Sequence, residues 1–168
     1  MKFKITLISL ILFVSAITIK KGFQLKYPDY FPEPNYDLKK NILTKETIAL
    51  GRTLFYDPIL SKNNTISCAS CHSSFNAFTH TDHSLSHGID DLIGTRNAPA
   101  LMNLAWQKLF MWDGAINHLD MQALAPINHP KEMGESINHI IDKLNKTAPY
   151  PTLFKKAFRD TIITGEKI

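Results

Sequence analysis

The two cysteines of the chain are separated by two residues, and a histidine follows the second, in Cys68-Ala69-Ser70-Cys71-His72. A disulfide across so short a loop stabilises a fold little. A thioredoxin-like redox pair needs a βαβ context that is missing here, and a zinc site needs four ligands. Covalent haem fits best, because two thiols at this spacing add to the vinyl groups on one porphyrin edge and the adjacent imidazole binds iron. The motif therefore predicts one haem c per chain, held by Cys68 and Cys71, with His72 as the proximal ligand.

The first 21 residues have the composition of an export signal. A short start containing Lys2 and Lys4 precedes residues 5–19, which carry no charge. This run is shorter than the roughly 20 residues that a membrane-spanning helix needs. An uncleaved anchor is the alternative, because no clean cleavage site follows. Both interpretations predict a periplasmic or otherwise exported protein.

The net charge of +4 comes from this first segment. Four of the 19 basic residues lie within residues 1–21, so the rest of the chain has as many basic as acidic residues. Because no cluster of Lys and Arg occurs elsewhere, the composition argues against a nucleic-acid partner.

The remaining sequence predicts an all-α domain with long loops. Residues 22–43, rich in Pro and Tyr, predict an extended lead-in without a core of its own. Caps, apolar spacing and flanking prolines predict helices over residues 44–56, 96–106, 118–125, 137–144 and 152–159. Residues 73–95 show no sustained period, and long loops of this kind are usually functional or disordered.

An ordered series of motifs resembles the di-haem cytochrome c peroxidase family, which includes the methylamine-utilisation relatives. The series contains Leu50-Gly51-Arg52, Asp57-Pro58, the cysteine motif, Gly94-Thr95-Arg96-Asn97-Ala98-Pro99, Trp112-Asp113-Gly114 and Glu132-Met133-Gly134. The match covers residues 44–168. The resemblance implies a cytochrome c-like haem domain that reduces hydrogen peroxide to water, with electrons from a small donor protein of the cytochrome c or cupredoxin type.

The resemblance also implies roles for side chains outside the cysteine motif. Glu132 would move a proton between the peroxide oxygens, and Gln122 would hydrogen-bond the bound peroxide. The alternatives are an acid at a helix start for Glu132 and a surface glutamine for Gln122. His87 is the candidate distal iron ligand. The alternative is that His80, His83 and His87 are all solvated loop histidines.

The segment around Trp112 carries the remaining implied features. Trp112 would lie on an electron route, although a core tryptophan is the commoner fate of this residue. Arg96 is expected to anchor the haem edge. The family usually has Arg where this chain has Ala115, which removes any ion pair that such an Arg would make. The resemblance also implies a calcium ion at a domain interface near Asn97, but a single ligand position does not establish it.

Family members have two haem domains, whereas this sequence has one C-x-x-C-H motif. We expect residues 1–21 to be a signal peptide or anchor, 22–43 the lead-in, and 44–168 the N-terminal haem domain, with a second haem domain supplied by another chain. Two alternatives stay open. One is a mono-haem electron-transfer protein, which needs a permanent sixth iron ligand. The other is an inactive truncated fragment.

Overall fold

The computed structural model describes residues 22–168, so the predicted export signal or anchor over residues 1–21 lies outside the described residues. The helices are α1 (Lys45–Tyr56), α2 (Cys68–Cys71), α3 (Leu119–Gln122), α4 (Leu124–Asn128), α5 (Ile137–Lys146) and α6 (Tyr150–Phe158), with five short 3₁₀ turns between and after them. Within residues 22–168 the only β pairings are isolated bridges, which agrees with the predicted all-α class. No helix in this range is long and apolar enough to cross a membrane.

The longest helix, α1, begins and ends close to the predicted residues because its caps are local. The Thr44 hydroxyl accepts from the Thr47 N–H, and the Thr47 hydroxyl accepts from the Thr44 N–H, so two otherwise unpaired donors are satisfied. At the other end, Asp57 has extended backbone angles and Pro58 follows it. Proline has no N–H to continue the helical ladder.

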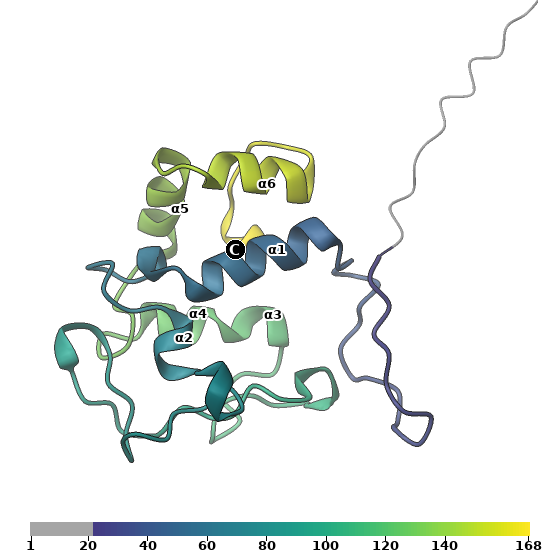
Figure 1. The fold of residues 1–168 in the computed structure, drawn as a ribbon, viewed down its shortest axis with the longest axis horizontal. Helices are drawn as coiled ribbons and strands as arrows, with labels where there is room; N and C mark the ends of the chain where they lie inside the picture. The colour runs from purple at the N-terminus through teal and green to yellow at the C-terminus, as the bar shows by residue number, and fades with distance from the viewer. Residues whose placement is uncertain (1–21) are drawn as a thin grey trace, which may run out of the picture.

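The main core lies between α1, α5 and α6. Leu50 and Leu54 of α1 belong to the same buried cluster as Ile140 and Leu144 of α5 and Phe154 of α6. The predicted apolar stripe of α5 is thus confirmed, since Ile140 and Leu144 are fully buried. Figure 1 shows α5 and α6 on one side of α1, with α2, α3 and α4 on the other. The core therefore holds α1 beside the cysteine motif of α2.

The predicted helix over residues 96–106 is wrong. Only the 3₁₀ turn Leu104–Trp106 is helical there, and the residues before it are irregular. Pro99 disfavours helical angles at Ala98, and Asn103 has a left-handed backbone with φ 53°. By contrast, the short helix expected over residues 118–125 is present as α3 and α4, and the last helix begins two residues earlier than expected.

The extended lead-in is fastened to the domain around Trp106. The Trp106 indole N–H donates to the Pro32 carbonyl at 2.7 Å. The rings of Tyr27 and Phe31 lie edge-on to it, with centroids 5.2 and 5.3 Å away. Trp106 thus holds the lead-in against the domain.

Candidate haem and peroxide site

The cysteine motif forms one helical turn, α2, with the two thiols free. The Ser67 N–H is bonded to the Ser70 hydroxyl at 3.0 Å, and the His72 N–H continues the turn to the Cys68 carbonyl at 2.9 Å. Burial is the main cause that raises the pKa of both thiols above the ordinary value. The two sulfurs are therefore neutral thiols at the first and last residues of one helical turn, available to form thioethers.

The imidazole of His72 is oriented by a backbone carbonyl. Its Nδ1 lies 2.9 Å from the oxygen of Phe78. This oxygen is brought back to His72 by a tight turn, in which Ala77 and Phe78 have left-handed angles of φ 54° and 57° and Ser73 pairs with Thr79. Because a carbonyl only accepts, Nδ1 carries the proton, which leaves the lone pair of Nε2 for a metal.

These donors fit a covalently bound haem. Two free thiols and an imidazole with an available Nε2 are the set that haem c attachment requires. A buried and unpartnered oxygen, Oε1 of Gln122, supplies an acceptor in the same domain.

The loop that carries His87 lies against the cysteine motif and against Glu132. The thiol of Cys71 donates to the His87 carbonyl at 3.6 Å. The next residue, Gly88, approaches the backbone so closely that a Cβ atom there would lie 2.0 Å from the Lys131 oxygen. The Ile89 N–H then donates to the Glu132 carbonyl at 2.8 Å. Three segments far apart in sequence thus meet at this point.

The side chain of His87 points to an acid. Its Nδ1 is 2.6 Å from Oδ1 of Asp91, and its ring lies against that of His83 with centroids 4.5 Å apart. The Asp91 contact occupies Nδ1, so Nε2 is the nitrogen through which His87 could reach a metal.

Glu132 lies in the turn between α4 and α5 rather than in the first turn of a helix, since α5 begins at Ile137. This placement contradicts the helix-start alternative. The carboxyl is about one-third exposed, and its Oε1 is 3.7 Å from Nδ1 of His129. After burial, the charge of Glu132 is the second cause that raises the pKa of the Cys71 thiol. The carboxyl is therefore within electrostatic range of the cysteine motif.

Gln122, the last residue of α3, is held by a sulfur atom. Its Nε2 donates to Sδ of Met111 at 3.0 Å, whereas Oε1 is buried with no partner among the described residues. A buried amide oxygen without a donor is costly, and a ligand that donates a proton would remove that cost. Gln122 as a whole is half-buried, and its amide oxygen is the part withdrawn from the surface.

Trp112 is not a core residue, because 64% of its surface is exposed. Its indole N–H donates to the Asn97 carbonyl at 2.8 Å. Beside it, Arg96 pairs with Asp113 at 2.7 Å, and the Arg96 hydrogen bond is the largest cause that lowers the Asp113 pKa. Asp113 thus forms an ion pair with Arg96 in this chain, which has alanine at position 115.

The calcium site implied near Asn97 gains little support. Oδ1 of Asn97 is buried without a partner, while its Nδ2 donates to the His83 carbonyl. However, residues 22–168 contain no group of three or more His, Cys, Asp or Glu side chains arranged to hold a metal ion.

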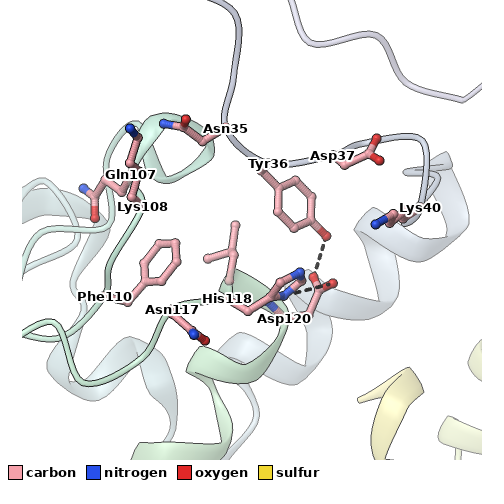
Figure 2. A pocket seen from close by; sticks show the side chains of 11 residues that line it. Asn35, Tyr36, Asp37, Lys40, Gln107, Lys108, Phe110, Asn117, His118 and Asp120 are labelled. Carbon is pink, nitrogen blue, oxygen red and sulfur yellow. Dashed lines mark hydrogen bonds and ion pairs between the residues drawn. The ribbon is translucent and has the colours of Figure 1, made fainter.

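A polar hollow of about 410 Å³ lies between the lead-in and residues 107–120 (Figure 2). The hydroxyl of Tyr36 donates to Asp120 of α3 at 2.5 Å and accepts from Asn41 at 2.9 Å. Burial, followed by the Asp120 hydrogen bond, raises the pKa of Tyr36 to about 12. The lead-in is thereby tied to the short helix that ends at Gln122, and no local sequence signal predicts this contact.

A buried acid was also missed by sequence reasoning. Glu135 is 6% exposed, and its carboxylate lies 3.1 Å from Nζ of Lys143 and 2.9 Å from Nδ1 of His139. Burial raises its pKa, but the Ser136 N–H, Lys143 and His139 outweigh this and lower it overall. The spacing of Glu135, His139 and Lys143, four residues each, is a signal that could have revealed the cluster.

Comparison with known proteins identifies the family of the chain. The model of the family described as di-haem cytochrome c peroxidase matches residues 45–168. The methylamine utilization protein MauG of Methylorubrum extorquens is 37% identical over 136 residues, covering 80% of this chain and 37% of that protein. The cytochrome c551 peroxidase of Nitrosomonas europaea is 38% identical over 121 residues, covering 71% of this chain and 35% of that protein.

Solved structures give the same result. A MauG-like protein associated with microbial copper homeostasis has a TM-score of 0.73 and 34% identity, covering 82% of this chain and 41% of that structure. The di-haem peroxidase BthA from Burkholderia thailandensis has a TM-score of 0.63 and 26% identity, covering 71% of this chain and 34% of that structure. This sequence thus spans well under half the length of these relatives. With its free C-x-x-C-H thiols and oriented His72, the chain belongs to the di-haem cytochrome c peroxidase family.

Proposed function

We propose that residues 44–168 form a haem c-dependent peroxidase domain that reduces hydrogen peroxide to water with electrons from a redox partner. One observation carries the proposal: the Glu132 segment packs against the loop of His87, which in turn contacts Cys71 of the haem-attachment motif. A carboxyl near a haem-binding turn would serve peroxide cleavage as a general acid and base. The membership of the family supports the same reaction class.

Cys68 and Cys71 would hold one haem c through thioethers, and His72 would bind its iron through Nε2. When bound, this group supplies the electrons that break the O–O bond. The Phe78 carbonyl keeps the imidazole of His72 in the correct tautomer and orientation. Arg96 is proposed to lie at the haem edge, although its guanidinium pairs with Asp113.

Glu132 is the proposed proton carrier. Reduction of one peroxide molecule consumes two protons and two electrons and yields two water molecules. The carboxyl of Glu132 takes a proton from one peroxide oxygen and delivers it to the other, the leaving oxygen. The Glu132 carboxyl is about one-third exposed, so it is proposed to exchange protons with solvent directly.

Gln122 is proposed to orient the peroxide. Its buried Oε1 has no partner among the described residues and accepts a hydrogen bond from the O–H of peroxide. The Met111 contact holds the amide, so that Oε1 rather than Nε2 points away from the sulfur.

Electrons are proposed to enter through Trp112, whose exposed ring suits contact with a second redox centre. A second redox centre is proposed to receive electrons from a cytochrome c or cupredoxin-type donor and to pass them to the haem of this domain. The covalent haem and the composition of residues 1–21 favour a periplasmic or otherwise exported location. A calcium ion near Asn97 would belong to the same domain interface.

A mono-haem electron-transfer protein is the second candidate, because His87 lies beside the cysteine motif with Nε2 available. A permanently bound His87 would close the sixth iron position. A peroxidase needs the position open or openable, so His87→Ala distinguishes the two. Higher peroxide reactivity in the variant indicates a closed carrier. Unchanged spectra indicate that His87 does not bind iron.

The decisive experiment begins with expression alongside c-haem maturation. We expect one covalent haem per chain, and a colourless protein would disprove the haem site. Glu132→Gln should then slow peroxide turnover about 100-fold with an unchanged haem spectrum. Glu166→Gln, in the C-terminal 3₁₀ turn Gly165–Lys167, is the matched control and should leave turnover unchanged. Full activity in Glu132→Gln would remove Glu132 from the mechanism, and no turnover in the parent chain supplied with an artificial electron donor would identify an inactive fragment.

A further inference from the structure

We propose that His80 and His83 form a surface site for a tetragonal divalent cation of the Cu(II) or Ni(II) class. Nε2 of His80 lies 2.8 Å from Nδ1 of His83, and the two rings are nearly parallel at 12°. A neutral imidazole has one N–H and one lone pair, so a single proton lies between these nitrogens. A site that shares one proton between two imidazoles can exchange that proton for a metal cation.

The donor types favour one class of cation. The 2.8 Å separation is that of the hydrogen bond, which the cation would replace. Among the divalent first-row cations, Cu(II) binds a given set of nitrogen and oxygen donors most tightly, followed by Ni(II) and Zn(II). Tetragonal coordination by nitrogen and oxygen donors is typical of Cu(II) and Ni(II).

The surroundings leave room for the cation. His83 is exposed and His80 half-buried, so the rings can rotate until both lone pairs meet at the metal. The described residues offer no group of three such side chains around one point, so two imidazoles anchor the cation and water completes its coordination. The neighbouring His87 is engaged by Asp91 through Nδ1 and lies against the face of His83.

The test titrates Cu(II) into the purified chain by calorimetry and by electron paramagnetic resonance. Cys68 and Cys71 are either linked to haem or alkylated, so that free thiols do not bind copper. We expect one Cu(II) per chain with nitrogen hyperfine structure. His80→Gln and His83→Gln should each weaken binding at least tenfold, while Zn(II) binds more weakly than Cu(II).

Two other exposed histidines serve as matched controls. His118 and His139 each lie beside an acid elsewhere in the domain, and their Gln variants should bind Cu(II) like the parent chain. Absence of binding, or binding that survives both His80→Gln and His83→Gln, would overturn the proposal. The measurement needs neither haem nor peroxide turnover, so its failure is separate from a failure of the proposed peroxidase function.

Discussion

Nδ1 of His72 lies 2.9 Å from the carbonyl oxygen of Phe78, which follows a left-handed residue, Ala77. The orientation of the proposed iron ligand therefore depends on a strained turn rather than on another side chain. An L-residue in the left-handed region destabilises the fold by about 1–2 kcal/mol. At Ala77 this conformation turns the chain so that the Phe78 oxygen faces the imidazole of His72.

The turn predicts the effect of a glycine substitution. Ala77→Gly should raise the free energy of unfolding by about 1 kcal/mol, because glycine adopts positive φ without strain. The measurement is denaturant unfolding followed by circular dichroism. The same substitution at Ala49, within α1, is the control and should lower stability by about 1 kcal/mol. A loss of stability in both variants would show that the Ala77 backbone is not strained.

Gly88 and Gly51 should respond in opposite ways to the same alanine substitution. At Gly88 the new Cβ atom would lie 2.0 Å from the Lys131 oxygen and 2.7 Å from Cα of Glu132. Backbone must shift, so we expect a loss of about 3 kcal/mol. At Gly51 nothing lies within 4 Å, and alanine in a helix should add up to about 1 kcal/mol. Thermal unfolding of the two variants compares these signs, and an unaltered melting temperature for Gly88→Ala would contradict the close approach.

Tyr36→Phe should lower the unfolding free energy by about 1 kcal/mol at neutral pH, because Asp120 loses the hydroxyl donor. The pKa of Tyr36 is raised from 10.0 to about 12 in the folded state. The folded protein thus holds this proton more tightly, so the stabilisation is full below pH 10 and is lost as the pH rises towards 12. Unfolding measured from pH 7 to 12 should show the difference between parent and variant shrinking.

The control for this experiment is Tyr27→Phe. Tyr27 also donates to a carboxylate, Glu33, but both groups lie on the exposed lead-in away from α3. We expect its stability at pH 7 to equal that of the parent chain. An equal loss of stability in the two variants would mean that the Tyr36–Asp120 hydrogen bond stabilises the fold no more than the exposed Tyr27–Glu33 hydrogen bond does.

Lys143→Met should destabilise the fold by about 3 kcal/mol, because it leaves Glu135 charged and buried. The variant also removes the donor to the carbonyl of Ser61, a fully buried residue. The pKa of Glu135 is lowered, so its contribution is present above the ordinary pKa of 4.5 and is lost as the pH falls below that value. Urea unfolding from pH 3 to 7 should show a steeper acid loss in the parent than in the variant. Lys146→Met, on the exposed side of α5, should match the parent throughout.

The sequence allowed prediction wherever the signal was local. The i, i+3, i+4, i+7 spacing located the buried side of α5, and the C-x-x-C-H spacing located the thiols and His72. The expected helix at residues 96–106 was wrong because proline and a left-handed Asn103 determine the backbone there. The contact of Tyr36 with Asp120 joins residues 84 positions apart, and no periodicity reports such a pair.

The close packing at Gly88 limits how the candidate site can rearrange. Because Gly88 has no side chain, its main chain lies directly against that of Lys131 and Glu132, and the hydrogen bond from the Ile89 N–H to the Glu132 carbonyl fixes their register. The backbones of His87 and Glu132 are therefore expected to move together. A main-chain motion that withdraws the histidine also withdraws the acid, whereas rotation about the His87 side-chain bonds clears the imidazole and leaves the acid in place.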